Sequence, residues 1–147
     1  MTENNSNSLP GWWKKVMLEN YANFKGRARR AEYWYFTLGN FIVMFALYSM
    51  GLAAAFMGSM TIFYIVMALY GFYALASFIP SLAVAVRRLH DINRSGWYIL
   101  VGLIPLVGGI ILLVWAFTDG DRFVNKYGDD PKNPAALTFD FEQTQPN

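Results

Sequence analysis

The only histidine of the chain lies in a short charged segment, residues 87–97, with the sequence RRLHDINRSGW. This segment places His90 next to Asp91 among three arginines. Adjacent residues of a helix point about 100° apart, so Asp91 is poorly placed to orient the His90 imidazole as the acid of a catalytic triad does. Since neither a serine motif nor a pair of carboxylates completes a site, we expect no catalytic residue and no enzyme activity.

A second basic cluster, FKGRARRAEYW, occupies residues 24–34. In helical spacing, each cluster gathers several cations on one face. The planar guanidinium group suits phosphate oxygens, and a basic residue beside an anionic leaflet contributes about 1 kcal/mol. The candidate residues for binding an anionic ligand or a lipid headgroup are Arg27, Arg30, Glu32, Arg87, Arg88, His90, Asp91 and Arg94.

The acids inside these clusters suggest contacts between them. We expect an internal network in which Glu32 and Asp91 brace arginines of the other segment. Within residues 87–97, Arg87 and Asp91 have the i, i+4 spacing of a helical ion pair. The simpler interpretation is that the arginines only fix the topology and anchor helix ends.

The composition is that of a membrane protein, with 55% hydrophobic and 15% charged residues, against about 25% charged in soluble domains. The absence of cysteine excludes disulfides and thiolate ligands, and a single histidine makes a zinc site improbable. We therefore expect no metal and no cofactor. The net charge is only +2 and the bases lie next to apolar runs, so nucleic acid is not an expected partner.

The elements that position the clusters follow from one uncharged run. Residues 33–86 are 54 residues without Asp, Glu, Lys or Arg. As a helix they would extend about 80 Å, whereas the hydrocarbon core is about 30 Å thick. The run must cross twice, and the MGSMT sequence at residues 57–61 suits a tight connection. We predict spans near residues 33–56 and 62–86.

A third uncharged run covers residues 97–117 and is just long enough for one crossing. Pro105, Gly108 and Gly109 interrupt its centre, and they predict a kink because proline removes a backbone donor and glycine loosens a helix. We expect a single, kinked crossing. The alternative is a re-entrant run that enters the membrane and returns to the same side.

An amphipathic helix is predicted at residues 11–24, where Trp13, Val16, Met17, Tyr21 and Phe24 fall on one face. It either lies on the membrane surface or packs against the protein's own loops. The expected fold is therefore an all-α membrane protein with three transmembrane helices, the third kinked or re-entrant, behind an interfacial helix. We predict a single membrane domain at residues 11–131, with disorder at residues 1–10 and 132–147.

The distribution of bases predicts the orientation. Six of the twelve Lys and Arg residues precede the first span and three follow the second. Two crossings put both groups of bases on the same side of the membrane. The positive-inside rule assigns that side to the cytoplasm, so the N-terminus is expected to be cytoplasmic. No cleaved signal peptide is expected, because the first apolar run is far longer than a secretory one.

Three motifs occur in order along the chain: FKGRARRAEYW, PSLAVAVRRLHDINRSGWYILVGLIPLVGGIILLVW and DRFVNKYGDDP. With them, residues 21–131 resemble the small bacterial inner-membrane proteins grouped as domain of unknown function 805, the YhaH-like proteins. The resemblance implies a bacterial inner membrane and a helical multi-pass fold, without an established activity. If the NKYGDDP turn shares a surface with RRLHD, the tail should be cytoplasmic, which favours the re-entrant alternative.

The leading hypothesis is a non-enzymatic inner-membrane protein whose cytoplasmic Arg/His/Asp network binds anionic lipid headgroups or a membrane partner. The expected partners are the bilayer, anionic phospholipids, and a second copy of the chain or another membrane protein. One alternative is a small transporter or channel subunit, although the spans lack the ionisable residues that coupled transporters use. Another is an enzyme that modifies membrane lipids.

Overall fold

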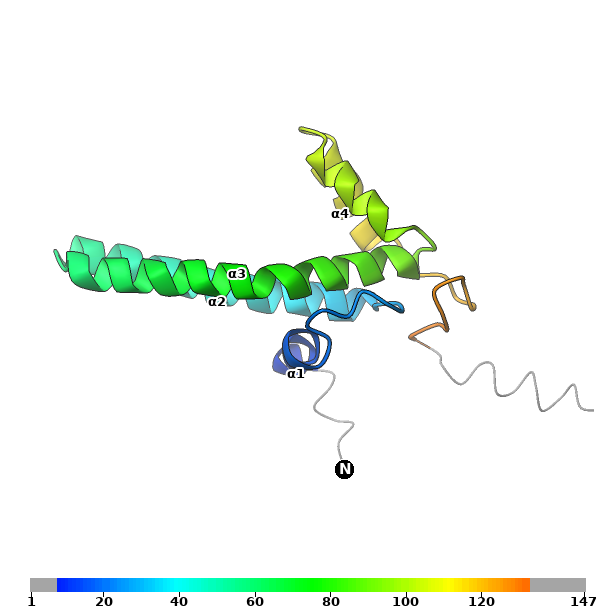
Figure 1. Ribbon diagram of the computed structural model, residues 1–147, viewed down its shortest axis with the longest axis horizontal. Coiled ribbons are helices and arrows are strands. Elements are labelled where there is room, and N and C mark those ends of the chain that lie inside the picture. The colour runs from blue at the N-terminus through cyan, green and yellow to red at the C-terminus, as the bar shows by residue number, and fades with distance from the viewer. Residues whose placement is uncertain (1–7, 133–147) are drawn as a thin grey trace, which may run out of the picture. The chain divides into compact units, whose positions relative to one another are not determined.

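The computed structural model describes residues 8–132, and in that range every regular element is a helix. The all-α expectation is confirmed for this part of the chain. In order, the elements are α1 (Leu9–Lys14), the π-helical η1 (Lys15–Glu19), α2 (Arg30–Phe56), α3 (Met60–Asp91), the 3₁₀-helical η2 (Gly96–Leu103) and α4 (Gly108–Phe117), as Figure 1 shows.

The chain forms two compact units. The first holds α1, η1, α2 from Ala31 and α3 as far as Val84. The second holds residues 24–30, the end of α3 from Ala85, η2, α4 and the tail. All three motifs noted in the sequence contribute to the second unit.

Helices α2 and α3 form an antiparallel hairpin in the first unit. Both are long and apolar enough to cross a membrane, with lengths of about 40 and 48 Å at 1.5 Å per residue. They meet where Gly51 leaves room for Met67, and where the Tyr73 hydroxyl donates to Asn40 Oδ1. Gly58, at φ +77°, forms the connection between them and falls inside the predicted fold-back.

The N-terminal helix begins and ends earlier than predicted. Ser8 caps α1 by accepting a hydrogen bond from the Gly11 N–H at 3.3 Å, and η1 ends at Glu19. The Trp13 ring lies against Gly39 of α2, 3.1 Å from where a Cβ would be. The helix therefore packs on its own protein. The disorder predicted at the two ends falls mostly on residues outside the described range.

A proline inside α3 explains one long-range contact of this unit. Pro80 has no N–H to donate to the carbonyl of Ala76, four residues earlier. The Tyr21 hydroxyl donates to that carbonyl at 2.7 Å instead. The N-terminal segment thus satisfies a backbone acceptor that lipid cannot satisfy.

Within the second unit, α3 ends in a Schellman motif. Asn93 adopts the left-handed conformation, at φ 58°. The Arg94 N–H donates to the Leu89 carbonyl at 2.9 Å and the Asn93 N–H to the His90 carbonyl at 3.0 Å, the pattern typical of this motif. Asparagine is one of the few residues that take this conformation readily, so the chain can leave the helix and turn toward η2.

The third apolar run is not a continuous helix. It is two short antiparallel helices, η2 and α4, with the Tyr98 and Trp115 rings in edge contact at 5.7 Å. The turn between them contains Pro105 and a left-handed Leu106 at φ 66°. Gly108 lies so close to the Val101 carbonyl that a Cβ would overlap it. The single crossing is therefore not confirmed.

Candidate functional site

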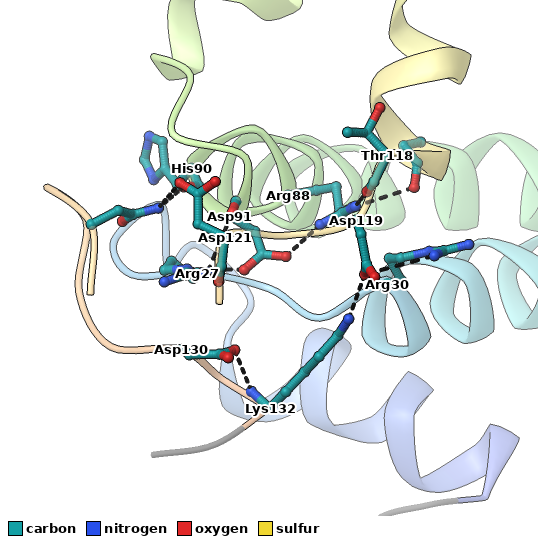
Figure 2. A network of polar contacts seen from close by, with 12 residues as sticks. Arg27, Arg30, Arg88, His90, Asp91, Thr118, Asp119, Asp121, Asp130 and Lys132 are labelled. Atoms are coloured by element: carbon teal, nitrogen blue, oxygen red, sulfur yellow. Dashed lines mark hydrogen bonds and ion pairs between the residues drawn. The ribbon is translucent and has the colours of Figure 1, made fainter. Parts of the chain in front are cut away.

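Arg27 is the centre of the polar cluster in the second unit. Its Nε donates to Asp91 Oδ1 at 2.9 Å (Figure 2). Its Nη1 donates to the Phe123 carbonyl at 2.8 Å. Further bonds run from Nη1 to the Gly128 carbonyl at 3.3 Å and from Nη2 to the carbonyls of Asp91 and Asp121. Only 1% of the side chain is exposed, so its hydrogen bonds are made inside the protein.

Arg88 completes a buried Arg–Asp–Arg cluster, which we define as Arg27, Asp91 and Arg88. Its Nη1 donates to Asp91 Oδ2. Its Nε donates to the Ala116 carbonyl at 3.3 Å, and its Nη2 to the Thr118 carbonyl. These carbonyls lie at the C-terminal end of α4, where the helix dipole favours a cation. The cluster carries a net charge of +1, two arginines against one aspartate, and backbone carbonyls surround the excess charge.

The partner of Asp91 on its own helix differs from the one predicted. It is Arg88, at i, i+3, rather than Arg87, at i, i+4. Arg88 is drawn to this side because the end of α4 supplies carbonyl acceptors for its remaining donors. Arg87 is also buried, and its carbonyl accepts from the Ala28 N–H at 3.0 Å. The prediction that Asp91 braces an arginine of the N-terminal segment is confirmed.

His90 and Asp91 have different partners, as their helical spacing suggests. His90 Nδ1 lies 3.1 Å from the Gly26 carbonyl. Since a carbonyl only accepts, Nδ1 must carry the proton. The imidazole stacks on the Tyr127 ring, with centroids 3.8 Å apart and planes 6° from parallel. His90 therefore joins all three motifs structurally, through residues 26, 90 and 127.

The tail contributes residues that the candidate set did not contain. Asn125 Nδ2 donates to the His90 carbonyl at 2.9 Å and to Asp121 Oδ2 at 3.2 Å. The Asp121 N–H donates to the Asp91 carbonyl at 2.9 Å. Gly120 lies against the Asp91 carboxylate and leaves no room for a Cβ. For Asp121 and Asn125, the only signal in the sequence is the DRFVNKYGDDP motif, because their acceptors are mostly backbone carbonyls, which no residue type reveals.

A more exposed ion pair lies at the edge of the cluster. Asp119 accepts from Lys132 and lies 3.7 Å from Arg30 Nη1, and the Arg30 and Asp119 side chains are 42% and 56% exposed. The hydrogen bond from Lys132 and its positive charge lower the pKa of Asp119, and Arg30 adds to the effect. Arg30 is thus attached to the tail through Asp119.

Arg94 lies apart from the buried cluster, at the open end of the η2–α4 hairpin. Its guanidinium carbon is 4.4 Å from the centroid of the Trp115 ring and 5.7 Å from that of Tyr98. A cation over an aromatic face is held without hydrogen bonding. Within residues 8–132, Arg94 makes no ion pair, and its guanidinium lies over two aromatic rings.

The remaining candidate, Glu32, belongs to the other unit. It is buried, and one oxygen lies 3.7 Å from Lys15 Nζ. Arg27, Arg88, Asp91 and His90 meet in the second unit. That Glu32 braces an arginine of residues 87–97 stays a prediction. Residues 8–132 contain no group of three or more His, Cys, Asp or Glu side chains suited to a metal ion.

These features define a small helical membrane protein in which three charged segments pack around one buried Arg–Asp–Arg cluster. The chain belongs to the family described as Protein of unknown function (DUF805), whose model matches residues 21–129 and so spans the whole cluster. It is 43% identical over 124 residues to the inner membrane protein YhaI of Escherichia coli strain K12, covering 82% of this chain and 95% of that one. It is 42% identical over 123 residues to the inner membrane protein YhaH of the same strain, covering 82% and 96%. No solved structure matches the chain.

Proposed function

We propose that this inner-membrane protein is non-enzymatic, and that its charged second unit binds anionic phospholipid headgroups at the cytoplasmic surface. The names of YhaI and YhaH support the inner membrane. Six of the twelve Lys and Arg residues come before residue 33, and three more lie at or just after the end of α3, between residues 87 and 94. This distribution supports a cytoplasmic N-terminus by the positive-inside rule.

The buried arginines have a structural role in this proposal. Arg27 and Arg88 donate to Asp91 and to backbone carbonyls, and their side chains are 1% and 2% exposed. A lipid phosphate would have to displace those bonds to reach either guanidinium. The cluster instead holds the loop and the tail in place, so that the outer bases face the membrane surface.

The observation that carries the proposal is the position of Arg94. Its guanidinium lies over the Trp115 ring and near that of Tyr98. Both rings sit at the polar ends of apolar helices, where aromatic residues meet lipid headgroups. A stacked guanidinium is already oriented, and its free edge matches the oxygens of a phosphate. Phosphatidylglycerol and cardiolipin are therefore the expected ligands, in preference to zwitterionic lipids.

The test compares lipid association in reconstituted protein. The association of spin-labelled phosphatidylglycerol and phosphatidylcholine is measured in bilayers of phosphatidylcholine by electron paramagnetic resonance. The intact chain should prefer phosphatidylglycerol, and Arg94→Gln should reduce that preference about fivefold, the equivalent of about 1 kcal/mol. Arg122→Gln removes an equal charge from an exposed base of the tail and serves as the matched control.

Two results would count against the proposal. Equal association of both lipids with the intact protein would exclude headgroup selection and leave a membrane protein or a second copy as the partner. Equal losses in Arg94→Gln and Arg122→Gln would mean that net charge acts alone, without the aromatic platform.

A further inference from the structure

The η2–α4 hairpin is built to reach only half of a bilayer. Eight residues of 3₁₀ helix at about 2.0 Å each extend about 16 Å, and ten residues of α-helix at about 1.5 Å extend about 15 Å. The hydrocarbon core is about 30 Å thick. Each limb therefore matches the thickness of one leaflet.

The tip of the hairpin is apolar and highly exposed. Leu103, Leu106 and Val107 are 79%, 92% and 53% exposed. Water is an unfavourable environment for such a group of side chains, whereas acyl chains solvate them. The occupant of this surface is therefore the hydrocarbon of one leaflet.

Three backbone N–H groups at the tip have hydrogen-bond partners within the turn. The N–H groups of Ile104, Val107 and Gly108 donate to the carbonyls of Val101, Pro105 and Ile104, at 3.0, 2.8 and 3.0 Å. Pro105 has no N–H to satisfy. A turn inside the membrane is tolerated only when its polar groups are paired, and this turn pairs these three donors internally.

The two ends of the hairpin are tied together at its polar end. Arg88, just before the loop to η2, donates to the Ala116 and Thr118 carbonyls at the end of α4. The Asp121 N–H then donates to the Asp91 carbonyl at 2.9 Å. A tail on the opposite side of the membrane could make neither contact.

We propose that residues 96–117 form a re-entrant hairpin that inserts its apolar tip into one leaflet and returns, so that the loop at residues 92–95 and the tail lie on the same side. All twelve Lys and Arg residues then share that side. This inference does not depend on headgroup binding, because it concerns the path of the chain and not its ligand.

The chain contains no cysteine, so single cysteines can report the topology. The positions are Ala22 in the N-terminal segment, Met57 in the α2–α3 turn, Leu106 at the tip and Asp129 in the tail. A membrane-impermeant maleimide added to intact cells should label Met57→Cys. Ala22→Cys and Asp129→Cys should react only after permeabilisation, and Leu106→Cys should not react from either side.

The depth of the tip is measured on a nitroxide attached to Leu106→Cys, which should lie near the bilayer centre. Labelling of Asp129→Cys in intact cells would establish a single crossing and overturn the proposal. Labelling of Leu106→Cys in intact cells would show a tip that reaches the far surface, and labelling only after permeabilisation would show a tip in water. Either result refutes half-depth insertion.

Fusion reporters on the chain without cysteine substitutions provide a control, because a substitution could itself disturb membrane insertion. Fused after the last residue, green fluorescent protein should be fluorescent and alkaline phosphatase inactive. An active phosphatase would place the tail outside and contradict the hairpin, whatever the cysteine variants do.

Discussion

Asp91 is the single acid between two buried arginines, and its neutralisation should be the most damaging conservative substitution in the second unit. Asp91→Asn keeps the shape of the side chain but changes the cluster from +1 to +2. The substitution also weakens two charge-assisted hydrogen bonds, from Arg27 Nε at 2.9 Å and from Arg88 Nη1. Breaking a buried ion pair by removing one partner costs about 3–5 kcal/mol, and the side chains concerned are 1–2% exposed.

The assay is unfolding in mixed micelles at increasing mole fractions of sodium dodecyl sulfate, followed by circular dichroism. Asp91→Asn should lower the free energy of unfolding by about 3 kcal/mol or more. Asp119→Asn is the matched control, since Asp119 also pairs with two bases but is solvent-exposed, and it should change stability little. Equal losses in the two variants would refute the view that burial makes the Arg–Asp–Arg cluster important.

A double substitution separates charge from shape. Arg27→Gln combined with Asp91→Asn restores the cluster to +1, with Arg88 still able to donate to the carbonyls at the end of α4. The double variant should therefore be more stable than the sum of the two single losses predicts, by about 0.5–3 kcal/mol, as expected for residues in contact. Strict additivity would mean that the two side chains stabilise the protein independently.

Three further predictions concern the hairpins and the edge of the cluster. Gly108→Ala should destabilise the η2–α4 hairpin by about 1–3 kcal/mol, because the new Cβ meets the Val101 carbonyl. Gly109→Ala places its Cβ in open space and should leave stability nearly unchanged in the same unfolding assay. Tyr21→Phe should lower the free energy of unfolding by about 1 kcal/mol, because the Ala76 carbonyl, which Pro80 cannot bond, loses its donor. An unchanged free energy of unfolding would show that this hydrogen bond is dispensable. Lys132→Gln should raise the pKa of Asp119 toward its ordinary value, because the largest cause of its lowered pKa is the Lys132 hydrogen bond. The ion pair stabilises the fold above about pH 4, and this contribution is lost as the pH falls below that value. If nuclear magnetic resonance shows the same Asp119 titration in the variant, the Lys132 hydrogen bond is not the cause of the lowered pKa.

The two long helices could be predicted from the sequence because the physical constraint on them is simple. A 54-residue run without charge cannot remain in water, and at about 1.5 Å per residue it is too long for one crossing. The third run meets the same length criterion for one crossing, but the structure divides it into two short helices, so a continuous third span is not confirmed. What bends the run back is the approach of Gly108 to the Val101 carbonyl, a contact between two positions that composition and spacing do not reveal.

The polar cluster was predictable only in part, for a related reason. Side-chain charge identifies Asp91 and Arg27 as complementary, and the fold brings them together. The choice of Arg88 over Arg87 depends on the carbonyls of Ala116 and Thr118. Every residue has a backbone carbonyl, so the sequence does not indicate which carbonyls accept hydrogen bonds from the arginines. The same holds for the carbonyls of the tail that enclose Arg27.

The buried cluster and the path of the third run are energetically linked. Arg27 bonds the carbonyls of Phe123 and Gly128 in the tail, and Arg88 bonds that of Thr118. Moving the tail across the membrane would remove these acceptors and leave two guanidinium groups to share the carboxylate of Asp91. Because a buried cation without its hydrogen bonds is costly, the cluster opposes a full crossing more strongly than the few bases of the tail do. On the proposed re-entrant path, this set of hydrogen bonds and the distribution of charge therefore favour the same topology.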